Sequence, residues 1–238
     1  MRTRLVIRTR IGSEAVSELN LVLLGPPGSG KGTQAERLQE DLELPYYATG
    51  NILRAAVRDE TELGREAKEY MDRGDLVPDE VIIGVIAEAI AEHEAEDGFI
   101  LDGFPRTVGQ AEALGAKMDE LGRRLTAALL IDVSDEEVVR RLGGRRTCPN
   151  GHVFHVEFDP PEQEGVCDVC GAELTIRDDD KPDVIKNRLV QYRDKTEPLV
   201  AFYGDRGALE RVNGEKAPDE VYEDIRALLA TLRMEEEA

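Results

Sequence analysis

The sequence predicts an α/β fold in which a parallel sheet is covered by helices on both faces. Short apolar runs with strand character recur along the chain, and stretches of helical periodicity follow them. Strands that alternate with helices favour a parallel sheet, because each crossover helix packs on the sheet and returns the chain to its starting edge. The first apolar run ends in a Gly/Pro turn, as expected for a buried strand.

Four strand-and-helix units can be placed in chain order. The first strand is expected at residues 19–24, and a helix follows at 31–41. Glu136 and Glu137 suit the first turn of a later helix, because the helix dipole favours acidic groups there. The other strands are expected at 99–101, 127–131 and 209–212, and their helices at 108–121, 134–142 and 219–232.

Two stretches interrupt this alternation, and we interpret both as insertions into one core. The first, residues 48–77, contains short helices expected at 50–58 and 63–73, with Gly74 as a C-terminal cap. The second, residues 143–178, holds all three cysteines and alternates like short antiparallel strands. Gly143 and Gly144 are predicted to break the preceding helix and to form a hinge. The core is then expected at 19–47, 78–142 and 179–238, after a basic N-terminal extension at 1–18 that we predict to be disordered.

The composition predicts a cytoplasmic protein that binds neither nucleic acid nor membranes. The 238 residues carry a net charge of −20, which repels the phosphates of both partners. No apolar run approaches the roughly 20 residues of a membrane-spanning helix, and the N-terminus lacks the order of a secretory signal. A small phosphate-bearing ligand must therefore be met by cations that are gathered locally.

The strongest functional signal is the sequence Gly25-Pro-Pro-Gly-Ser-Gly-Lys31-Gly-Thr33, which follows a strand and opens a helix. Such glycines let successive backbone N–H groups turn toward phosphate oxygens, and the helix N-terminus adds positive potential. Lys31 supplies a mobile charge for the outer phosphates. Gly32 stands where the strict motif has Ser or Thr, and Thr33 comes one place later. The context favours a P-loop NTPase core over a glycine-rich turn with an incidental lysine.

A second signal is the apolar strand Phe99-Ile-Leu-Asp102, which continues as Gly-Phe-Pro-Arg106. P-loop enzymes hold Mg²⁺ near an aspartate at the end of such a strand, usually through water. Arg106 follows the carboxyl end of the strand, where open α/β sheets bind their ligands. The sequence therefore predicts a magnesium site at Asp102 and a ligand contact at Arg106.

Arginines bracket the second insertion. A solvated basic face is the ordinary explanation of such a cluster, but this acidic chain places Arg140-Arg141 and Arg145-Arg146 without interleaved acids. Guanidinium groups suit phosphate oxygens, and charges near a transition state speed a reaction. We therefore predict phosphate contacts at Arg141, Arg145, Arg177 and Arg188.

Together these residues resemble the adenylate kinase family in its long-lid form. The resemblance runs from about Leu19 to Leu232 and is carried by Lys31-Gly-Thr-Gln, Thr49-Gly50 with Arg54, Asp102-Gly-Phe-Pro-Arg106-Thr with Gln110, and Arg177-Asp-Asp-Asp180 before Arg188. It implies a P-loop core with a five-stranded parallel sheet, a monomer, and reversible phosphoryl transfer from Mg-ATP to AMP that gives two ADP. The first insertion becomes the AMP-binding insertion and the second becomes the lid. The chemistry agrees, because an AMP phosphate oxygen is already an anion and transfer needs no general base.

The resemblance also implies roles for the matching residues. The catalytic charges would be Lys31, Arg106, Arg141, Arg177 and Arg188. ATP would be bound by Gly28, Ser29, Gly30, Lys31, Gly32, Thr33, Arg141, Arg145 and Lys216. AMP would be bound by Thr49, Arg54, Asp75, Leu76, Val77, Gly103, Phe104, Pro105, Arg106, Gln110, Arg177 and Arg188. Asp179 and Asp180 would join Asp102 in serving Mg²⁺ or lid closure.

The cysteines of the lid predict a structural zinc site. A Cys-x-x-Cys pair in a cytosolic chain suggests a metal before a disulfide, and Cys167 and Cys170 form one. Many members of the family that the chain resembles have a second such pair, but here only Cys148 of that pair is present. His152 is the best substitute for the fourth ligand, and a decayed site held by hydrogen bonds and apolar contacts is the alternative. His155 is expected to pack or orient the lid, and His93 to be an ordinary helical residue.

Three other functions stay open at this point. A related nucleoside monophosphate kinase would use UMP, CMP or GMP as acceptor or GTP as donor, although Gln110 and Thr49 suit adenine. A zinc or redox module that merely binds nucleotide is disfavoured by Lys31 and the arginines. A motor or switch ATPase would need a residue that orients water and a partner-facing switch, and the sequence indicates neither.

Overall fold

The central sheet of the computed structural model has five parallel strands in the order β2-β3-β1-β4-β7. The structure describes residues 18–92 and 98–236. The strands are β1 (Leu19–Leu24), β2 (Tyr46–Ala48), β3 (Gly98–Asp102), β4 (Ala127–Asp132) and β7 (Leu209–Asn213). The predicted five-stranded parallel sheet is confirmed. The predicted extension at 1–18, apart from its last residue, and His93 lie outside the described residues.

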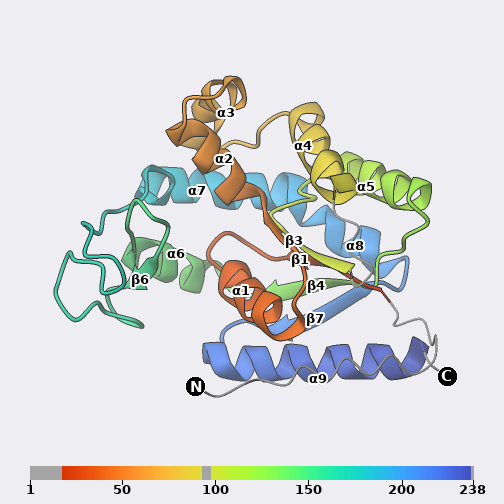
Figure 1. Ribbon diagram of the computed structural model, residues 1–238. Helices are drawn as coiled ribbons and strands as arrows, with labels where there is room; N and C mark the ends of the chain where they lie inside the picture. The colour runs from red at the N-terminus through yellow and green to blue at the C-terminus, as the bar shows by residue number, and fades with distance from the viewer. Residues whose placement is uncertain (1–17, 93–97, 237–238) are drawn as a thin grey trace, which may run out of the picture.

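Helices cover both faces of this sheet, which explains why β1 is buried along its whole length (Figure 1). On one face, α1 (Lys31–Leu42) and α9 (Pro218–Glu236) contribute Leu38 and Ile225 to a core that includes Leu21 of β1. On the other face, α4 (Asp79–Glu92), α5 (Val108–Glu120) and α8 (Pro198–Gly204) pack around Val22 and Leu101. Each strand thus sends alternate side chains into two separate cores.

The first insertion is a helical hairpin of α2 (Thr49–Arg58) and α3 (Glu62–Arg73), drawn in orange in Figure 1. The two helices pack closely at Gly64, where an added Cβ would lie 2.0 Å from the carbonyl oxygen of Ala56. Gly74 ends α3 in the left-handed conformation at φ 76°, so the predicted cap is confirmed. The helices begin one residue before the predicted starts.

The second insertion follows α6 (Asp135–Gly144) and contains an antiparallel pair, β5 (Arg145–Thr147) and β6 (Val153–His155). The helix α6 ends at Gly144, so it stops at the predicted glycine pair, although both glycines still belong to its last turn. The predicted hinge stays a prediction. Gly144 has another use, since an added Cβ would lie 2.2 Å from the His155 ring nitrogen Nε2. The missing side chain lets β6 approach the end of α6.

The chain returns to the core through elements that the sequence pattern does not predict. They are a short 3₁₀ turn, η1 (Asp178–Asp180), the helix α7 (Pro182–Gln191) and a π turn, η2 (Tyr192–Thr196), which leads directly into α8. Within the described ranges, no helix is long and apolar enough to cross a membrane.

Candidate active site

A cleft of about 1820 Å³ lies at the carboxyl edge of the sheet and is bordered by the core, the α2–α3 hairpin and the lid. Pockets for one small ligand usually enclose about 300–1,000 Å³, so this cleft has room for two nucleotides. Every residue predicted for ATP or AMP borders it except Phe104. The Phe104 side chain is 1% exposed and packs in the hydrophobic core instead.

The glycine-rich loop takes the backbone shape that its sequence predicts. Gly28 and Gly30 lie in the left-handed region at φ 78° and φ 98°, and Gly30 is the N-cap of α1. A side chain at Gly28 would also lie 2.8 Å from Leu142. The Lys31 ammonium donates to the carbonyl oxygens of Gly25 and Pro26, both at 2.8 Å. Burial lowers the pKa of Lys31 to about 8, against the opposing effect of the Asp102 carboxylate.

The end of β3 places Asp102 beside this loop, because Asp102 pairs with Leu23 of β1 in the sheet register. The Tyr46 hydroxyl donates to Asp102 Oδ2 at 3.1 Å, and Thr49 Oγ1 donates to the Asp102 carbonyl oxygen at 3.1 Å. Burial and the adjacent carboxylate raise the pKa of Tyr46 well above its ordinary value. Tyr46 is a site residue that motif reasoning does not find, since it contacts Asp102 from another strand.

Arg106 lies deep in the cleft, next to the predicted base-binding residue Gln110. Its Nε donates to the Gly103 carbonyl oxygen at 2.7 Å, and burial with Arg188 nearby lowers its pKa to about 10. Burial disfavours the charged form of this guanidinium, and an anion that binds beside it would favour the charged form again. The Arg106 backbone N–H donates to Gln110 Oε1 at 2.7 Å.

Two aspartates of η1 hold the predicted phosphate-binding arginines. Asp180 is 2% exposed and accepts a two-pronged contact from Arg145, at 2.6 and 2.7 Å. Arg188 pairs with Asp180 and Asp179, both at 3.2 Å, and Arg54 lies 3.8 Å from Asp179. The carboxylates of Asp179 and Asp180 therefore form ion pairs with arginines, which agrees with the lid-closure role more than with a magnesium role.

Arg177 and the other polar residues of the AMP side are also placed by local contacts. Arg177 Nε donates to Thr147 Oγ1 at 3.0 Å, and burial with Arg145 nearby lowers its pKa to about 10. The Asp75 carboxylate accepts from Arg73 and Asn187, both at 2.9 Å, so it is turned toward α3 and α7.

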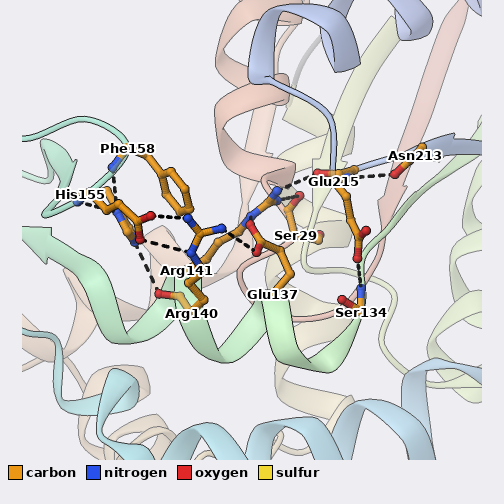
Figure 2. Close-up of polar contacts among 11 residues, drawn as sticks. Ser29, Ser134, Glu137, Arg140, Arg141, His155, Phe158, Asn213 and Glu215 are labelled. Atoms are coloured by element: carbon orange, nitrogen blue, oxygen red, sulfur yellow. Dashed lines mark hydrogen bonds and ion pairs between the residues drawn. The ribbon is translucent and has the colours of Figure 1, made fainter.

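Arg141 joins the phosphate loop to the end of β7. Its guanidinium donates to the carbonyl oxygens of Ser29 at 3.2 Å and Gly214 at 2.8 Å, and to Glu137 Oε1 at 2.8 Å (Figure 2). Glu137 lies one helical turn before Arg141, a spacing that brings side chains together on a helix. The sequence could have suggested this partner, although it was predicted only as a dipole-favoured residue.

The same helix continues to the base of the lid. Arg140 pairs with Glu157 and lies over the Phe158 ring, 4.5 Å from its centroid (Figure 2). His155 stacks on Phe158 at 4.2 Å, and its Nδ1 accepts from the backbone N–H groups of Glu157 and Phe158, both at 3.1 Å. His155 therefore packs within the lid, as predicted.

Lys216 borders the cleft, but its ammonium forms an ion pair with Asp224 on α9. Its neighbour Glu215 accepts a hydrogen bond from the Ser134 backbone N–H at 3.1 Å, which ties the loop after β7 to the start of α6 (Figure 2). The predicted ATP contact at Lys216 thus lies at the edge of the cleft, with its ammonium paired to α9.

The lid brings its three cysteines and His152 together. The ligand atoms of Cys148, His152, Cys167 and Cys170 all lie within 4.8 Å of one another. His152 Nδ1 is 3.2 Å from Cys148 Sγ and 3.4 Å from Cys167 Sγ, and the sulfurs of Cys148 and Cys170 are 3.7 Å apart. A tetrahedral zinc with bonds of about 2.3 Å to sulfur and 2.05 Å to nitrogen separates its ligands by roughly 3.5–3.8 Å. The Cys₃His set therefore fits zinc in both chemistry and spacing.

A phosphate-binding loop that faces buried arginines across one cleft suits transfer between two anionic substrates. The fold and site thus define a nucleotide phosphotransferase of the P-loop class. The family model described as adenylate kinase matches residues 23–208. An adenylate kinase of Methanococcoides burtonii is 53% identical over 87% of this chain and 96% of its own length, and one of Methanosarcina barkeri is 48% identical over 89% and 98%. An adenylate kinase of Oceanobacillus iheyensis is 47% identical over 89% of this chain and 99% of its own. The chain belongs to the adenylate kinase family.

Proposed function

We propose that this chain catalyses the reversible transfer of a phosphoryl group from Mg-ATP to AMP, giving two molecules of ADP. The observation that carries the proposal is the single cleft of about 1820 Å³, bordered both by the phosphate loop and by Gln110 with its neighbouring arginines. Membership of the adenylate kinase family supports the same reaction and does not favour another acceptor.

In this reaction an oxygen of the AMP phosphate attacks the terminal phosphorus of ATP. The bond from that phosphorus to the bridging oxygen breaks, and the electron pair leaves with ADP. No proton has to move, so the protein contributes position and positive charge. Lys31, Arg106 and Arg177 suit this role because burial disfavours their charged forms until phosphate oxygens arrive.

The metals are part of the proposal. Mg²⁺ bound to ATP would neutralise charge on the phosphate oxygens, and Asp102 would hold its water ligands. Zinc in the lid would be structural, held by Cys148, Cys167, Cys170 and His152, because the described cluster lies in the lid's own small core.

The proposal also covers two segments that move during the reaction and the oligomeric state of the enzyme. We assign residues 48–77 to an AMP-binding insertion and 143–178 to a lid, both of which close to exclude water. The enzyme is expected to work as a monomer in the cytoplasm. Sedimentation at micromolar concentration tests the first of these expectations.

The decisive experiment measures ADP formation with AMP, UMP, CMP and GMP as acceptors and with ATP or GTP as donor. We expect a strong preference for ATP with AMP, and slow ATP hydrolysis when no acceptor is present. Preference for UMP or CMP would make the chain another nucleoside monophosphate kinase, and rapid hydrolysis without AMP would make it an ATPase.

Substitution of the cleft cations tests which residues carry the reaction. Lys31→Ala and Arg106→Ala should each lower kcat by about 10²–10³-fold, the usual loss when one stabilising charge is removed. Lys117→Ala on α5 is the matched control, since that lysine pairs with Glu120 on the surface. Loss of fold together with activity in the two cleft variants would instead identify those cations as structural.

A further inference from the structure

The side-chain amide of Gln110 is held from behind by two groups of the protein. Gln110 is 2% exposed and borders the cleft, with Oε1 accepting from the Arg106 backbone N–H at 2.7 Å. Its Nε2 donates to Asp79 Oδ1 at 2.7 Å. Asp79 is not among the described residues that border the cleft. It therefore acts on Gln110 from the protein side.

These two partners leave the amide only one orientation. A backbone N–H can only donate, and a carboxylate can only accept. A flipped amide would set its NH₂ group against the Arg106 N–H and its oxygen against the Asp79 carboxylate, two repulsive contacts in place of two hydrogen bonds. Hydrogen bonding alone thus fixes which end of the Gln110 amide is oxygen.

The Asp79 carboxylate is itself held in place. The Thr107 hydroxyl donates to Asp79 Oδ2 at 2.7 Å, and the same hydroxyl accepts from the Gln110 backbone N–H at 3.1 Å. Thr107 is the N-cap of α5, and Asp79 is the first residue of α4. Asp79 at the start of α4 thus orients the Gln110 side chain on the first turn of α5.

The fixed orientation matters because purine bases differ in polarity at the edge that an amide reads. Gln110 keeps one N–H and one oxygen lone pair for a ligand after its two protein contacts. Adenine offers an amino donor next to a ring-nitrogen acceptor. A 6-oxopurine offers an oxygen acceptor next to an N–H donor, so it needs the amide turned over.

We propose that Asp79 is a positioning residue that determines acceptor specificity, by locking the Gln110 amide in the polarity that adenine requires. The inference rests on the proposed function, because it needs Gln110 to face the base of the acceptor. Asp79 acts through Gln110 and does not touch the nucleotide.

The test compares AMP with IMP, which has the same size and phosphate but the opposite polarity at this edge. The wild-type enzyme should strongly prefer AMP. In Asp79→Ala, the ratio of kcat/KM for AMP to kcat/KM for IMP should fall by about tenfold or more, because the amide can then turn over for IMP. The fall is expected to be partial, since the Arg106 N–H remains.

Glu80→Ala is the matched control, because Glu80 is an exposed acid in the same first turn of α4. It removes the same charge from the helix N-terminus and should leave the AMP:IMP ratio unchanged. Asp79→Ser is a second variant that keeps a residue favoured at a helix start but is too short to hold Gln110 and Thr107 together. It should reproduce the loss of selectivity if Asp79→Ala does not fold.

The outcomes separate this inference from the function on which it rests. If wild-type protein does not phosphorylate AMP, the proposed function fails. If it uses AMP and IMP equally well, the proposed function stands but the inference is overturned, because the enzyme then does not discriminate the polarity of the purine edge. If the wild type is selective and folded Asp79→Ala or Asp79→Ser loses activity by the same factor with both acceptors, Asp79 is merely structural and the inference is overturned.

Discussion

At the scale of single residues, Lys31 carries a charge that the protein alone stabilises poorly. Its ammonium reaches two carbonyl oxygens of the phosphate loop, yet burial, Arg106 and Arg188 lower its pKa to about 8 despite the opposing effect of Asp102. Phosphate oxygens beside the ammonium favour the charged form. A bound nucleotide should therefore raise the pKa of Lys31 again.

This coupling predicts that ATP binding takes up protons at pH values just above 8, the pKa to which Lys31 is lowered. The free enzyme has lost part of the Lys31 proton there, and the bound phosphates restore it. ATP affinity should consequently fall as pH rises through that value. Calorimetry in two buffers of different ionisation enthalpy measures the uptake, and Lys31→Met should abolish it.

The stability of the nucleotide-free protein should depend on pH in the opposite direction, rising where ATP affinity falls. In the nucleotide-free protein, the Lys31 pKa of about 8 is below the ordinary 10.5, so the folded state binds fewer protons between these values. The destabilisation from burying the charged ammonium is complete below pH 8 and is relieved as pH rises to 10.5. Lys31→Met should therefore raise the melting temperature at pH 7, and a decrease would contradict the assigned pKa.

Residues within contiguous motifs could be placed from the sequence, whereas their distant partners could not. The phosphate loop and the run from Asp102 to Arg106 are each one contiguous segment at the end of a predicted strand. Their residues are therefore neighbours in space because they are neighbours in the chain. Asp79 contacts Gln110 from 31 positions away, and Tyr46 contacts Asp102 from 56. Such contacts depend on how helices and strands pack, and a single sequence carries no local signal of that packing.

At the scale of elements, the lid has little hydrophobic core of its own. Its buried apolar cluster consists of Cys148, Phe154, Cys167 and Leu174. Units of fewer than about 40 residues usually need a metal or disulfides to fold stably. All three cysteines are free thiols, so zinc is the group that would stabilise this element.

We therefore expect one zinc per chain and a lower melting temperature in Cys167→Ser, with a smaller effect on turnover at moderate temperature. Val169→Ser is the matched control, because Val169 lies between Cys167 and Cys170 but is 68% exposed. Metal analysis and thermal unfolding on the same samples check this. Unchanged stability and metal content in Cys167→Ser would show that the thiols act only by packing.

Elements with strong periodicity were predictable, and elements that depend on neighbours were not. β2 has only three residues, too few to show a pattern, and it is a strand because it pairs with β3. The π turn of η2 lies between two helices; Pro198 at the start of α8 signals a helix boundary there, but it does not indicate a π turn. Gly143 and Gly144 mark the end of α6, but no local pattern shows that Gly144 also makes room for the His155 ring.

At the scale of the whole molecule, the net charge is the property that can be calculated most directly from the sequence. The chain has 50 acidic and 30 basic residues, so 20 acids have no basic residue to balance them. The order of the strands in the sheet, in contrast, depends on which strands pair, and no local pattern in the sequence states that. Surface ion pairs such as Lys68–Asp72 are exposed and contribute little each. Repulsion among the excess acids should therefore outweigh attraction within the pairs.

We accordingly expect added salt to stabilise the protein. Between 10 mM and 150 mM NaCl the screening length falls from about 30 Å to about 8 Å, which weakens long-range repulsion more than contact pairs. A gain of about 2 kcal/mol would raise the melting temperature by roughly 4–8 °C in a protein of this size. Replacing the exposed Glu40, Glu66 and Glu112 together by glutamine should raise the melting temperature at 10 mM salt and reduce its further rise with NaCl. Since screening acts on pairs as well, a melting temperature that falls as salt is added would mean that the ion pairs dominate.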